Sequence, residues 1–275
     1  MDKAARKKQR LDVLLVERGL ADSREQARRL ILAGKVTVAG ADNPKPGQQY
    51  FSDIELLIAE REKFVSRGGL KLEKALEYFK VDVRGKVCAD IGASTGGFTD
   101  CFLQYGATRV FAVDVGASQM HSRIKNDPRV ILLENTNARE LKAETFDERP
   151  GIIACDVSFI SLTKILPAVR AAVDPGAGCI ALIKPQFEAE RAEVSRGKGV
   201  IRDPAIHRRI LLELLSQFPA MGWRPSGLMA SPISGGSGNR EFLVHLVAST
   251  PLETTLPNTS DIDIDEVLQE ASKGL

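Results

Sequence analysis

Residues 87–100 read VCADIGASTGGFTD and decide the fold of the chain. An apolar run ends at Asp90, glycines follow at positions 92, 96 and 97, and an amphipathic segment runs from Phe98 to Tyr105. This order predicts a strand, a glycine-rich turn and a helix, with a turn that lets a ligand approach the backbone. Roughly twenty residues on, a second apolar run ends at Asp114, and an acid at that spacing can bind the two hydroxyls of a ribose. The two segments predict a pocket for a nucleoside-containing cofactor.

The spacing of the glycines narrows the choice of cofactor. The pattern is G-x-x-x-G-G, which differs from the G-x-G-x-x-G of dinucleotide-binding turns, and no Gly-Lys-Ser or Gly-Lys-Thr is present to form a phosphate-binding loop. The carboxylate of Asp90 would repel a pyrophosphate and attract a cation. We therefore expect S-adenosylmethionine, a cationic cofactor; an ordinary turn without a ligand is the alternative.

The composition is that of a soluble protein with one large and one small domain. The chain has 275 residues, of which 43% are hydrophobic and 27% are charged. No apolar run approaches the roughly 18 residues that a membrane span needs, and the basic N-terminus lacks the apolar core of a signal peptide. The four cysteines show no CxxC spacing, so we expect buried, reduced thiols rather than disulfides or a metal site. These features predict a cytoplasmic protein with no metal and no membrane partner.

Charge is distributed unevenly along the chain. Residues 1–35 hold ten lysines and arginines against five acids, whereas residues 250–275 hold one lysine against six acids. A basic N-terminal part favours a polyanionic partner, most simply a nucleic acid. For residues 1–9 alone, a solvated basic tail is the favoured explanation.

Residues 10–58 have the pattern of a small α+β domain. A helical period ends at Gly19, Ser23 is a good N-cap, and a second amphipathic helix ends at Gly34. Short strands are predicted over residues 36–38 and 53–58.

We expect the basic residues of this small domain to lie close together. Arg24 and Arg28 share one side of the second helix, and Lys35 follows that helix directly. Side chains placed in this way can lie along a phosphate backbone. Arginines that are only solvated are the alternative.

Beyond residue 86 the chain alternates between apolar, strand-like runs and amphipathic, helix-like segments. The predicted strands cover residues 87–91, 109–114, 130–133, 152–156, 179–184, 226–232 and 242–248. The predicted helices cover residues 97–105, 117–126, 162–173 and 204–218. Such alternation predicts a doubly wound, mostly parallel sheet whose ligands bind at the carboxyl ends of the strands. The short glycine-rich connection over residues 234–239 predicts an antiparallel hairpin for the last two strands.

These patterns divide the chain into four parts. Residues 1–60 form the small domain with a basic extension, residues 61–69 a linker, residues 70–249 the large domain and residues 250–275 an acidic tail with one short helix over residues 265–271. Two features of the large domain have no clear role: a polar loop with Arg191, Arg196, Lys198 and Arg202, which fits either RNA contact or solvation, and His207, expected on a helix surface.

Charged residues stand at the ends of three predicted strands. Asp156 and Lys184 each follow an apolar run, and Glu241 precedes the last strand. If the hairpin forms as predicted, all three lie at the same edge of the sheet. A lysine directly after a buried strand is costly unless it is paired or functional. The arrangement predicts a site, with a structural ion pair as the alternative.

The chain closely resembles the TlyA family within the FtsJ-like methyltransferases. The resemblance covers about residues 10–248, and residues 10–38 look like an S4-like RNA-binding module. It rests on five motifs: VSRGGLKL at 65–72, DIGASTGGFTD at 90–100, DVSFISL at 156–162, LIKPQFE at 182–188 and GNREFL at 238–243. One departure is Ala117-Ser118, which stand where many members have an aromatic residue.

The resemblance implies a fold and an activity. The fold is α/β, a Rossmann-like class I methyltransferase domain with a seven-stranded, mostly parallel sheet and a small S4-like α+β domain. The activity is S-adenosylmethionine-dependent methylation of a cytidine ribose 2′-hydroxyl in ribosomal RNA, with the RNA or a ribosomal subunit as partner. The Lys-Asp-Lys-Glu tetrad of the family falls on Lys71, Asp156, Lys184 and Glu241.

The chemistry suits these residue types. A ribose 2′-hydroxyl is a poor nucleophile while protonated, and a positioned amine can take its proton or hold its oxygen in line with the methyl group. We expect Lys184 to act as base or steering group, Asp156 to orient it, and Lys71 and Glu241 to position the ribose and phosphate.

The remaining expected site residues bind the cofactor or the RNA. The cofactor residues are Asp90, Gly92, Ser94, Gly96, Gly97, Phe98, Asp114 and Asn137. The RNA-binding residues are Arg10, Arg24, Arg28, Lys35 and Arg67. For Asn137, capping of the following turn is an equal alternative to contact with adenine.

Three other functions compete with this interpretation. An RNA-binding protein with an inactive methyltransferase domain would retain the small domain but not the intact tetrad and glycine turn. A small-molecule methyltransferase would leave the basic N-terminal part unexplained. A membrane-active haemolysin, as the historical name of the family suggests, would need a long apolar or strongly amphipathic surface, which the sequence lacks.

Overall fold

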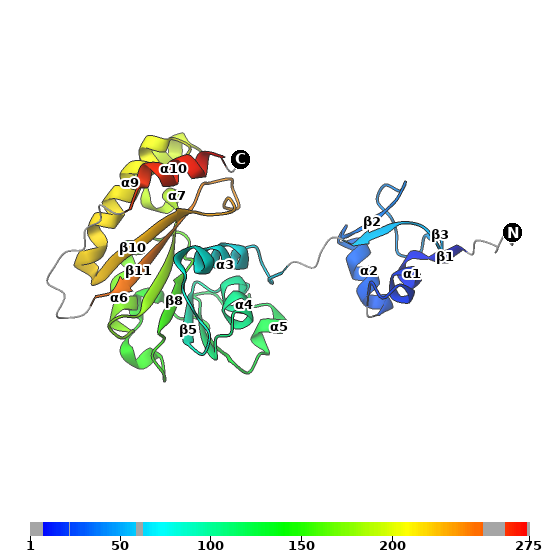
Figure 1. Cartoon of the computed structure of the whole chain (residues 1–275), viewed down its shortest axis with the longest axis horizontal. Coiled ribbons are helices and arrows are strands. Elements are labelled where there is room, and N and C mark those ends of the chain that lie inside the picture. The colour runs from blue at the N-terminus through cyan, green and yellow to red at the C-terminus, as the bar shows by residue number, and fades with distance from the viewer. Residues whose placement is uncertain (1–7, 22, 59–62, 250–261, 274–275) are drawn as a thin grey trace. The chain divides into compact units, whose positions relative to one another are not determined.

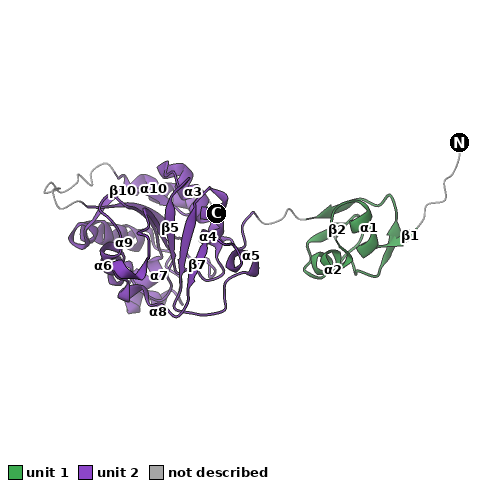
Figure 2. Cartoon of the chain, turned by 90° about the horizontal axis from the view of Figure 1, so that it is seen from below, with its two compact units in different colours: residues 1–62 green, residues 63–275 purple. Residues whose placement is uncertain are grey.

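The computed structural model describes residues 8–21, 23–58, 63–249 and 262–273. The chain divides into two compact units, residues 1–62 and residues 63–275, which Figure 2 shows in different colours. Three predicted features lie partly outside the described residues: the basic extension up to residue 7, the linker at residues 61–62 and the acidic tail at residues 250–261.

The small unit is built on two helices, α1 (Leu11–Glu17) and α2 (Arg24–Leu32). Ser23 begins α2 as predicted, because its hydroxyl accepts a hydrogen bond from the backbone N–H of Gln26 at 3.2 Å. The apolar sides of both helices meet in a core that also includes residues of the strands. The sequence pattern therefore predicted this pair of helices correctly.

Four short strands complete the small unit. They are β1 (Lys8–Arg10), which pairs antiparallel with β3 (Gln49–Phe51), and β2 (Val36–Val38), which pairs antiparallel with β4 (Leu56–Ile58). The predicted second strand starts later than expected because the backbone N–H of Ile54 closes a turn on the carbonyl of Phe51. β1 and β3 are too short to show an alternating pattern, so the sequence analysis missed them.

The large unit contains a seven-stranded sheet in the order β10-β11-β9-β8-β5-β6-β7 (Figure 1). Its strands are β5 (Val87–Ile91), β6 (Arg109–Val113), β7 (Val130–Leu133), β8 (Ile152–Cys155), β9 (Gly178–Ile183), β10 (Trp223–Ala230) and β11 (Phe242–Ala248). Strands β5 to β9 run parallel, whereas β11 is antiparallel to both β9 and β10. This topology confirms the predicted fold class and the C-terminal hairpin.

Helices cover both faces of this sheet. They are α3 (Gly68–Phe79), α4 (Gly97–Gln104), α5 (Ser122–Lys125), α6 (Leu166–Ala171), α7 (Pro185–Glu188), α8 (Arg191–Arg196), α9 (Pro204–Gln217) and α10 (Ile264–Lys273). Successive residues of β5 point to opposite faces: Cys88 joins the core with Phe102 of α4, and Ala89 joins the core with Leu211 of α9. The sheet is therefore buried on both faces, as parallel sheets require.

Three predicted elements of the large unit have clearly different bounds, whereas the others agree to within two residues at each end. The helix predicted over residues 117–126 shrinks to α5, because Ser118 has a left-handed φ of 61°. The helix predicted over residues 162–173 starts as a 3-10 turn, and α6 begins only beside Pro167, which lacks the N–H to continue that turn. β10 begins at Trp223, earlier than predicted, because an edge strand tolerates Pro225.

The described part of the acidic tail packs against the large unit. α10 lies against α9 and β10, with Ile264 and Val267 buried in the apolar core. Arg208 of α9 donates to Asp265 of α10 at 2.9 Å. Among the described residues, no helix combines the length and apolar character that crossing a membrane requires.

Candidate active site

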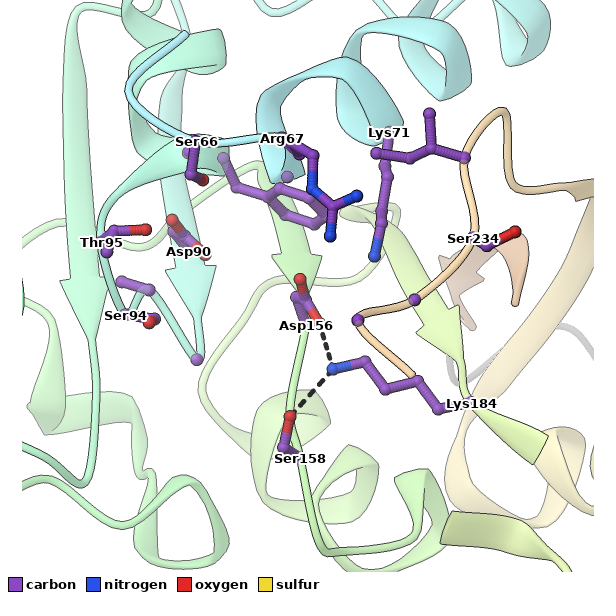
Figure 3. Close-up of a pocket in the computed structure, with 18 residues that line it drawn as sticks. Ser66, Arg67, Lys71, Asp90, Ser94, Thr95, Asp156, Ser158, Lys184 and Ser234 are labelled. Carbon is purple, nitrogen blue, oxygen red and sulfur yellow. Dashed lines mark hydrogen bonds and ion pairs between the residues drawn. The ribbon is translucent and has the colours of Figure 1, made fainter. Parts of the chain in front are cut away.

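The carboxyl ends of β5, β8 and β9 meet at a cavity of about 300 Å³, whose lining residues Figure 3 shows. The start of α3 and the loop between β10 and β11 complete its wall. β5 and β8 are neighbours, and the connections that follow them lead in opposite directions, from β5 to β6 and from β8 to β9. Open α/β sheets bind their ligands at this kind of switch point.

Lys184 and Asp156 form an ion pair in this cavity. Nζ of Lys184 lies 2.6 Å from Oδ1 of Asp156, and it donates a hydrogen bond to the hydroxyl oxygen of Ser158 at 3.0 Å (Figure 3). Asp156 directly follows β8 and Lys184 directly follows β9, so two neighbouring parallel strands set the position of the pair. An amine held in this way can exchange a proton with a group bound in the cavity.

Lys71 and Glu241 form a second, more deeply buried pair. Nζ of Lys71 lies 2.5 Å from Oε2 of Glu241, and the two residues are 8% and 4% exposed. Lys71 reaches the cavity from α3, and Glu241 supports it from the residue before β11. The four residues of the predicted tetrad therefore lie together as two lysine–carboxylate pairs, with both amines directed into the cavity (Figure 3).

Asp90, at the end of β5, is a fully buried carboxyl in the wall of the cavity. Its Oδ2 accepts hydrogen bonds from the backbone N–H (2.9 Å) and the hydroxyl (2.7 Å) of Thr99, whereas Oδ1 has no hydrogen-bond partner among the described residues. Burial, with the added charges of Asp156 and Asp114, raises the pKa of Asp90 to about 7. A cationic ligand would relieve this unfavourable environment.

Two glycines of the turn allow close contacts that a side chain would prevent. Gly92 has a φ of 88°, and a Cβ there would lie 2.5 Å from the carbonyl oxygen of Asp156. At Gly97 a Cβ would lie 2.1 Å from the hydroxyl of Ser66, at the start of α3. Both residues line the cavity, as do Ser94 and Phe98. Among the described residues that line this cavity, Gly96 is absent. Its lack of a side chain instead leaves room for the sulfur of Met120.

Asp114 and Asn137 line an adjoining cavity of about 480 Å³ that shares Gly92, Ser94 and Asp156 with the first. The carboxylate of Asp114 accepts backbone hydrogen bonds from Ser94 and Gly116, both at 2.7 Å. Asn137 accepts a hydrogen bond from the backbone N–H of Arg139 at 3.1 Å, so it caps the following turn. The capping alternative for Asn137 is therefore present, and its side chain also faces the cavity.

Phe159 is an aromatic residue that the sequence analysis did not single out. It is 90% exposed, has a left-handed φ of 63° and lies near Phe187, with ring centroids 5.0 Å apart. It lines the second cavity three residues after Asp156. An exposed ring held in this backbone conformation is available for stacking on a ligand.

The residues predicted to bind RNA fall in different environments. Arg67 lines the active-site cavity, and Figure 3 shows its guanidinium pointing into it. In the small unit, Arg10 (2.8 Å) and Arg24 (3.4 Å) both contact the carboxylate of Asp12, which is fully buried. Arg28 is exposed and forms no ion pair with a described residue, and Lys35 is partly buried. Their contact with RNA stays a prediction.

His207 corrects an expectation of the sequence analysis. It was expected on the surface of a helix, but it is only 2% exposed. Its Nε2 lies 3.1 Å from the carbonyl oxygen of Ile201, and its ring meets Phe242 edge-on. Burial lowers the pKa of His207, which favours the neutral ring. A polar residue at a helical position facing the sheet has no sequence signal that distinguishes it from a surface residue.

Comparisons with known proteins agree with this architecture. Residues 64–248 match the FtsJ-like methyltransferase family, and residues 9–41 match the S4 domain. The chain is 50% identical to YqxC of Bacillus subtilis, provisionally named an rRNA methyltransferase, over 87% of this chain and 86% of that protein.

Two further relatives carry different names. The 16S/23S rRNA (cytidine-2′-O)-methyltransferase TlyA of Mycobacterium tuberculosis is 43% identical over 88% of this chain and 90% of that protein. A solved structure from Streptococcus thermophilus, provisionally named a hemolysin, is 42% identical, has a TM-score of 0.75 and covers 98% of both chains. The chain therefore belongs to the FtsJ-like methyltransferases, and within them to the TlyA-like proteins that carry an N-terminal S4 domain.

Proposed function

We propose that this chain transfers the methyl group of S-adenosylmethionine to the ribose 2′-hydroxyl of a cytidine in ribosomal RNA. The observation that carries the proposal is that Lys71 and Lys184, each paired with a carboxylate, line one cavity together with the buried carboxyl of Asp90. The names of relatives such as TlyA of Mycobacterium tuberculosis support the choice of substrate.

The residues present fit S-adenosylmethionine. The unpartnered Oδ1 of Asp90 offers a cationic ligand a buried acceptor, and the glycine turn at Gly92 lines the same cavity. Asp114 and Asn137 line the adjoining cavity, where a nucleoside can lie. When bound, the cofactor supplies an electrophilic methyl group on a sulfonium.

Lys184 is the residue best placed to act on the hydroxyl of the substrate. Its amine lies at the cavity end of β9, fixed by Asp156 and Ser158 at 2.6 and 3.0 Å. In the neutral form it can accept the hydroxyl proton, and the proton can then pass to water. The oxygen would bond to the methyl carbon as the bond from that carbon to sulfur breaks, with S-adenosylhomocysteine as the leaving product. As a charged group Lys184 would instead hold the oxygen in line by a hydrogen bond.

Lys71, Glu241 and Arg67 are placed to position the RNA. Glu241 fixes the amine of Lys71 at 2.5 Å, and Arg67 extends its guanidinium into the same cavity. Cations at these positions can bind the phosphate next to the target ribose. The exposed ring of Phe159 can stack on an unpaired base, the usual form in which RNA bases are recognised.

Methyl transfer to ribosomal subunits that lack the modification tests the proposal. The wild-type protein should transfer labelled methyl to one or both subunits, and Lys184→Ala should lower the rate by roughly 10²–10⁴-fold, the usual contribution of general acid–base catalysis. Binding of S-adenosylhomocysteine, measured by calorimetry, should change little in the variant. Lys125→Ala, which removes an exposed lysine of α5, is the matched control and should retain full activity.

Two results would count against the proposal. If the wild-type protein binds the cofactor product but methylates neither subunit, an RNA-binding protein without this activity becomes the better interpretation. If Lys184→Ala retains the wild-type rate, Lys184 is neither base nor steering group.

A further inference from the structure

The loop between β10 and β11 connects the cavity to Glu241. Ser234, Gly235 and Gly236 line the cavity, and the backbone N–H of Gly235 donates to the carbonyl of Asn239 at 2.9 Å, which closes the turn. Gly235 lies so close to Glu241 that a Cβ on it would be 2.4 Å from Oε1. The position of this turn and the position of the Glu241 carboxylate therefore depend on each other.

Asn239 ties this turn to a distant segment. Its side chain is 2% exposed; Oδ1 accepts a hydrogen bond from the backbone N–H of Ile201, and Nδ2 donates one to the carbonyl of Gly199, both at 2.9 Å. One partner is a donor and the other an acceptor, so only an amide satisfies both. A buried polar group that loses such a partner is left unsatisfied, which is unfavourable.

A second contact holds the same segment from the other side. Nε2 of His207 bonds to the carbonyl of Ile201 at 3.1 Å, and its ring packs edge-on against Phe242 with centroids 5.6 Å apart. Asn239 precedes Glu241 by two residues and Phe242 follows it directly. Asn239, which precedes Glu241, thus holds Ile201 directly. Phe242, which follows Glu241, holds Ile201 through the ring of His207.

The anchored segment carries several positively charged side chains. Arg196, Lys198 and Arg202 surround the anchor points, and none of them forms an ion pair with a described residue. Lys198 has a left-handed φ of 50°, and a Cβ on Gly197 would lie 2.0 Å from the carbonyl oxygen of Val200, so the backbone makes a tight turn here. We call residues 196–202 the cationic turn.

We propose that Asn239 is a positioning residue that couples the cationic turn to the Lys71–Glu241 pair. Asn239 then anchors both the cationic turn, which binds RNA phosphate, and the carboxylate of Glu241, which holds the amine of Lys71. Binding of RNA at the turn therefore promotes the correct position of Glu241. This inference rests on the proposed function, because it assigns the turn to the same RNA substrate. Asn239 itself lies outside the lining of the cavity among the described residues, so it acts through Glu241 and not on the substrate.

Single-turnover methyl transfer at saturating RNA and cofactor tests this coupling. Asn239→Asp keeps the shape and the acceptor but removes the donor to Gly199; it should lower the saturated rate at least tenfold while the affinity for S-adenosylhomocysteine changes less than twofold. Lys198→Ala/Arg202→Ala should weaken RNA binding in any background. It should lower the saturated rate in the wild-type background but not in Asn239→Asp, because residues that act as one unit are non-additive. Asn126→Asp, at the exposed end of α5, is the matched control.

Amide hydrogen exchange provides a readout that does not depend on activity. In Asn239→Asp, or in Asn239→Ser should the first variant fail to fold, exchange should rise together at residues 199–201 and 234–241. Equal saturated rates in Asn239→Asp and wild type, rate effects that simply multiply, or exchange that rises in one segment alone would each overturn the inference. If the wild-type protein methylates no RNA while both segments still exchange together, the proposed function fails and the structural coupling stands.

Discussion

At the scale of single residues, the charged side chains of the site differ in whether they have a partner. Lys71 and Lys184 each have one carboxylate within 2.6 Å, whereas the buried carboxyl of Asp90 is satisfied on one oxygen only. The strand ends predicted a site with Asp156, Lys184 and Glu241, because a charged residue directly after an apolar strand is costly without a role. Lys71 joined them only through the resemblance to the TlyA family. The sequence did not indicate Ser158, Phe159 or Asn239, since short polar residues and single aromatics in loops are too common to carry a signal.

We expect Asp90 to make the affinity for the cofactor depend on pH. Because burial raises its pKa to about 7, the carboxyl is mostly protonated at pH 6 and mostly charged at pH 8. A cationic cofactor favours the charged form, so binding at low pH must release a proton, and affinity should fall by up to about tenfold per pH unit below 7. Calorimetry with S-adenosylmethionine in buffers of different ionisation enthalpy measures both the affinity and the proton release.

Two matched variants distinguish the effect of Asp90 on cofactor binding from the effect of another acidic residue. Asp90→Asn should bind more weakly at pH 8 and lose the pH dependence. Asp82→Asn should change nothing, since Asp82 is exposed and the Arg84 side chain already lowers its pKa to about 2. A wild-type affinity that is constant from pH 6 to pH 8 would show that the charge of Asp90 does not contribute to cofactor binding.

At the scale of elements, the strands were easier to predict than the helices. Apolar runs bounded by turns located all seven strands of the large sheet, because parallel strands are buried on both faces. Helix bounds depend on single backbone angles: the φ of 61° at Ser118 shortened α5, and Pro167 delayed α6. The docking of α10 could not be predicted either, since a short amphipathic helix after a linker has no signal for what it packs against.

The docking of α10 gives a prediction about stability. Val267 is 5% exposed in the core that α10 shares with α9 and β10, so Val267→Asp should destabilise the protein by about 2–4 kcal/mol, because it buries a charge without a partner. Gln269→Asp introduces the same charge on the exposed side of the same helix and should change stability little. Urea denaturation of both variants measures the difference; equal midpoints would show that α10 does not pack against the sheet in solution.

At the scale of the whole molecule, we expect the large unit to carry out the chemistry and the small unit to supply much of the RNA affinity. The charge gradient and the helix pattern pointed to a basic small domain, and the S4 match agrees with them. The sequence could not show that Arg10 and Arg24 share the buried carboxylate of Asp12, because an ion pair between a strand and two helices depends on tertiary structure. Arg28 is thus the predicted RNA-binding arginine of this unit that is not committed to Asp12.

If the small unit binds RNA phosphates, the loss of one of its arginines should change how RNA binding depends on salt. Arg28→Ala should weaken RNA binding and reduce the slope of log K against log salt by about one, as for the loss of one phosphate contact. Cofactor affinity should stay unchanged. Arg149→Ala is the control, because that arginine is paired with Asp174 at 2.6 Å. An unchanged salt slope in Arg28→Ala would exclude Arg28 from the RNA interface.

The position of the transferred methyl group tests the central claim most directly. After reaction with labelled cofactor, the modified ribosomal RNA is digested to nucleosides, and the labelled nucleoside is identified by mass spectrometry. The account predicts 2′-O-methylcytidine as the labelled product, absent when Lys184→Ala replaces the wild-type protein. Label recovered in a methylated base would contradict it, because the lysine–carboxylate pairs would then serve a different acceptor from the ribose hydroxyl.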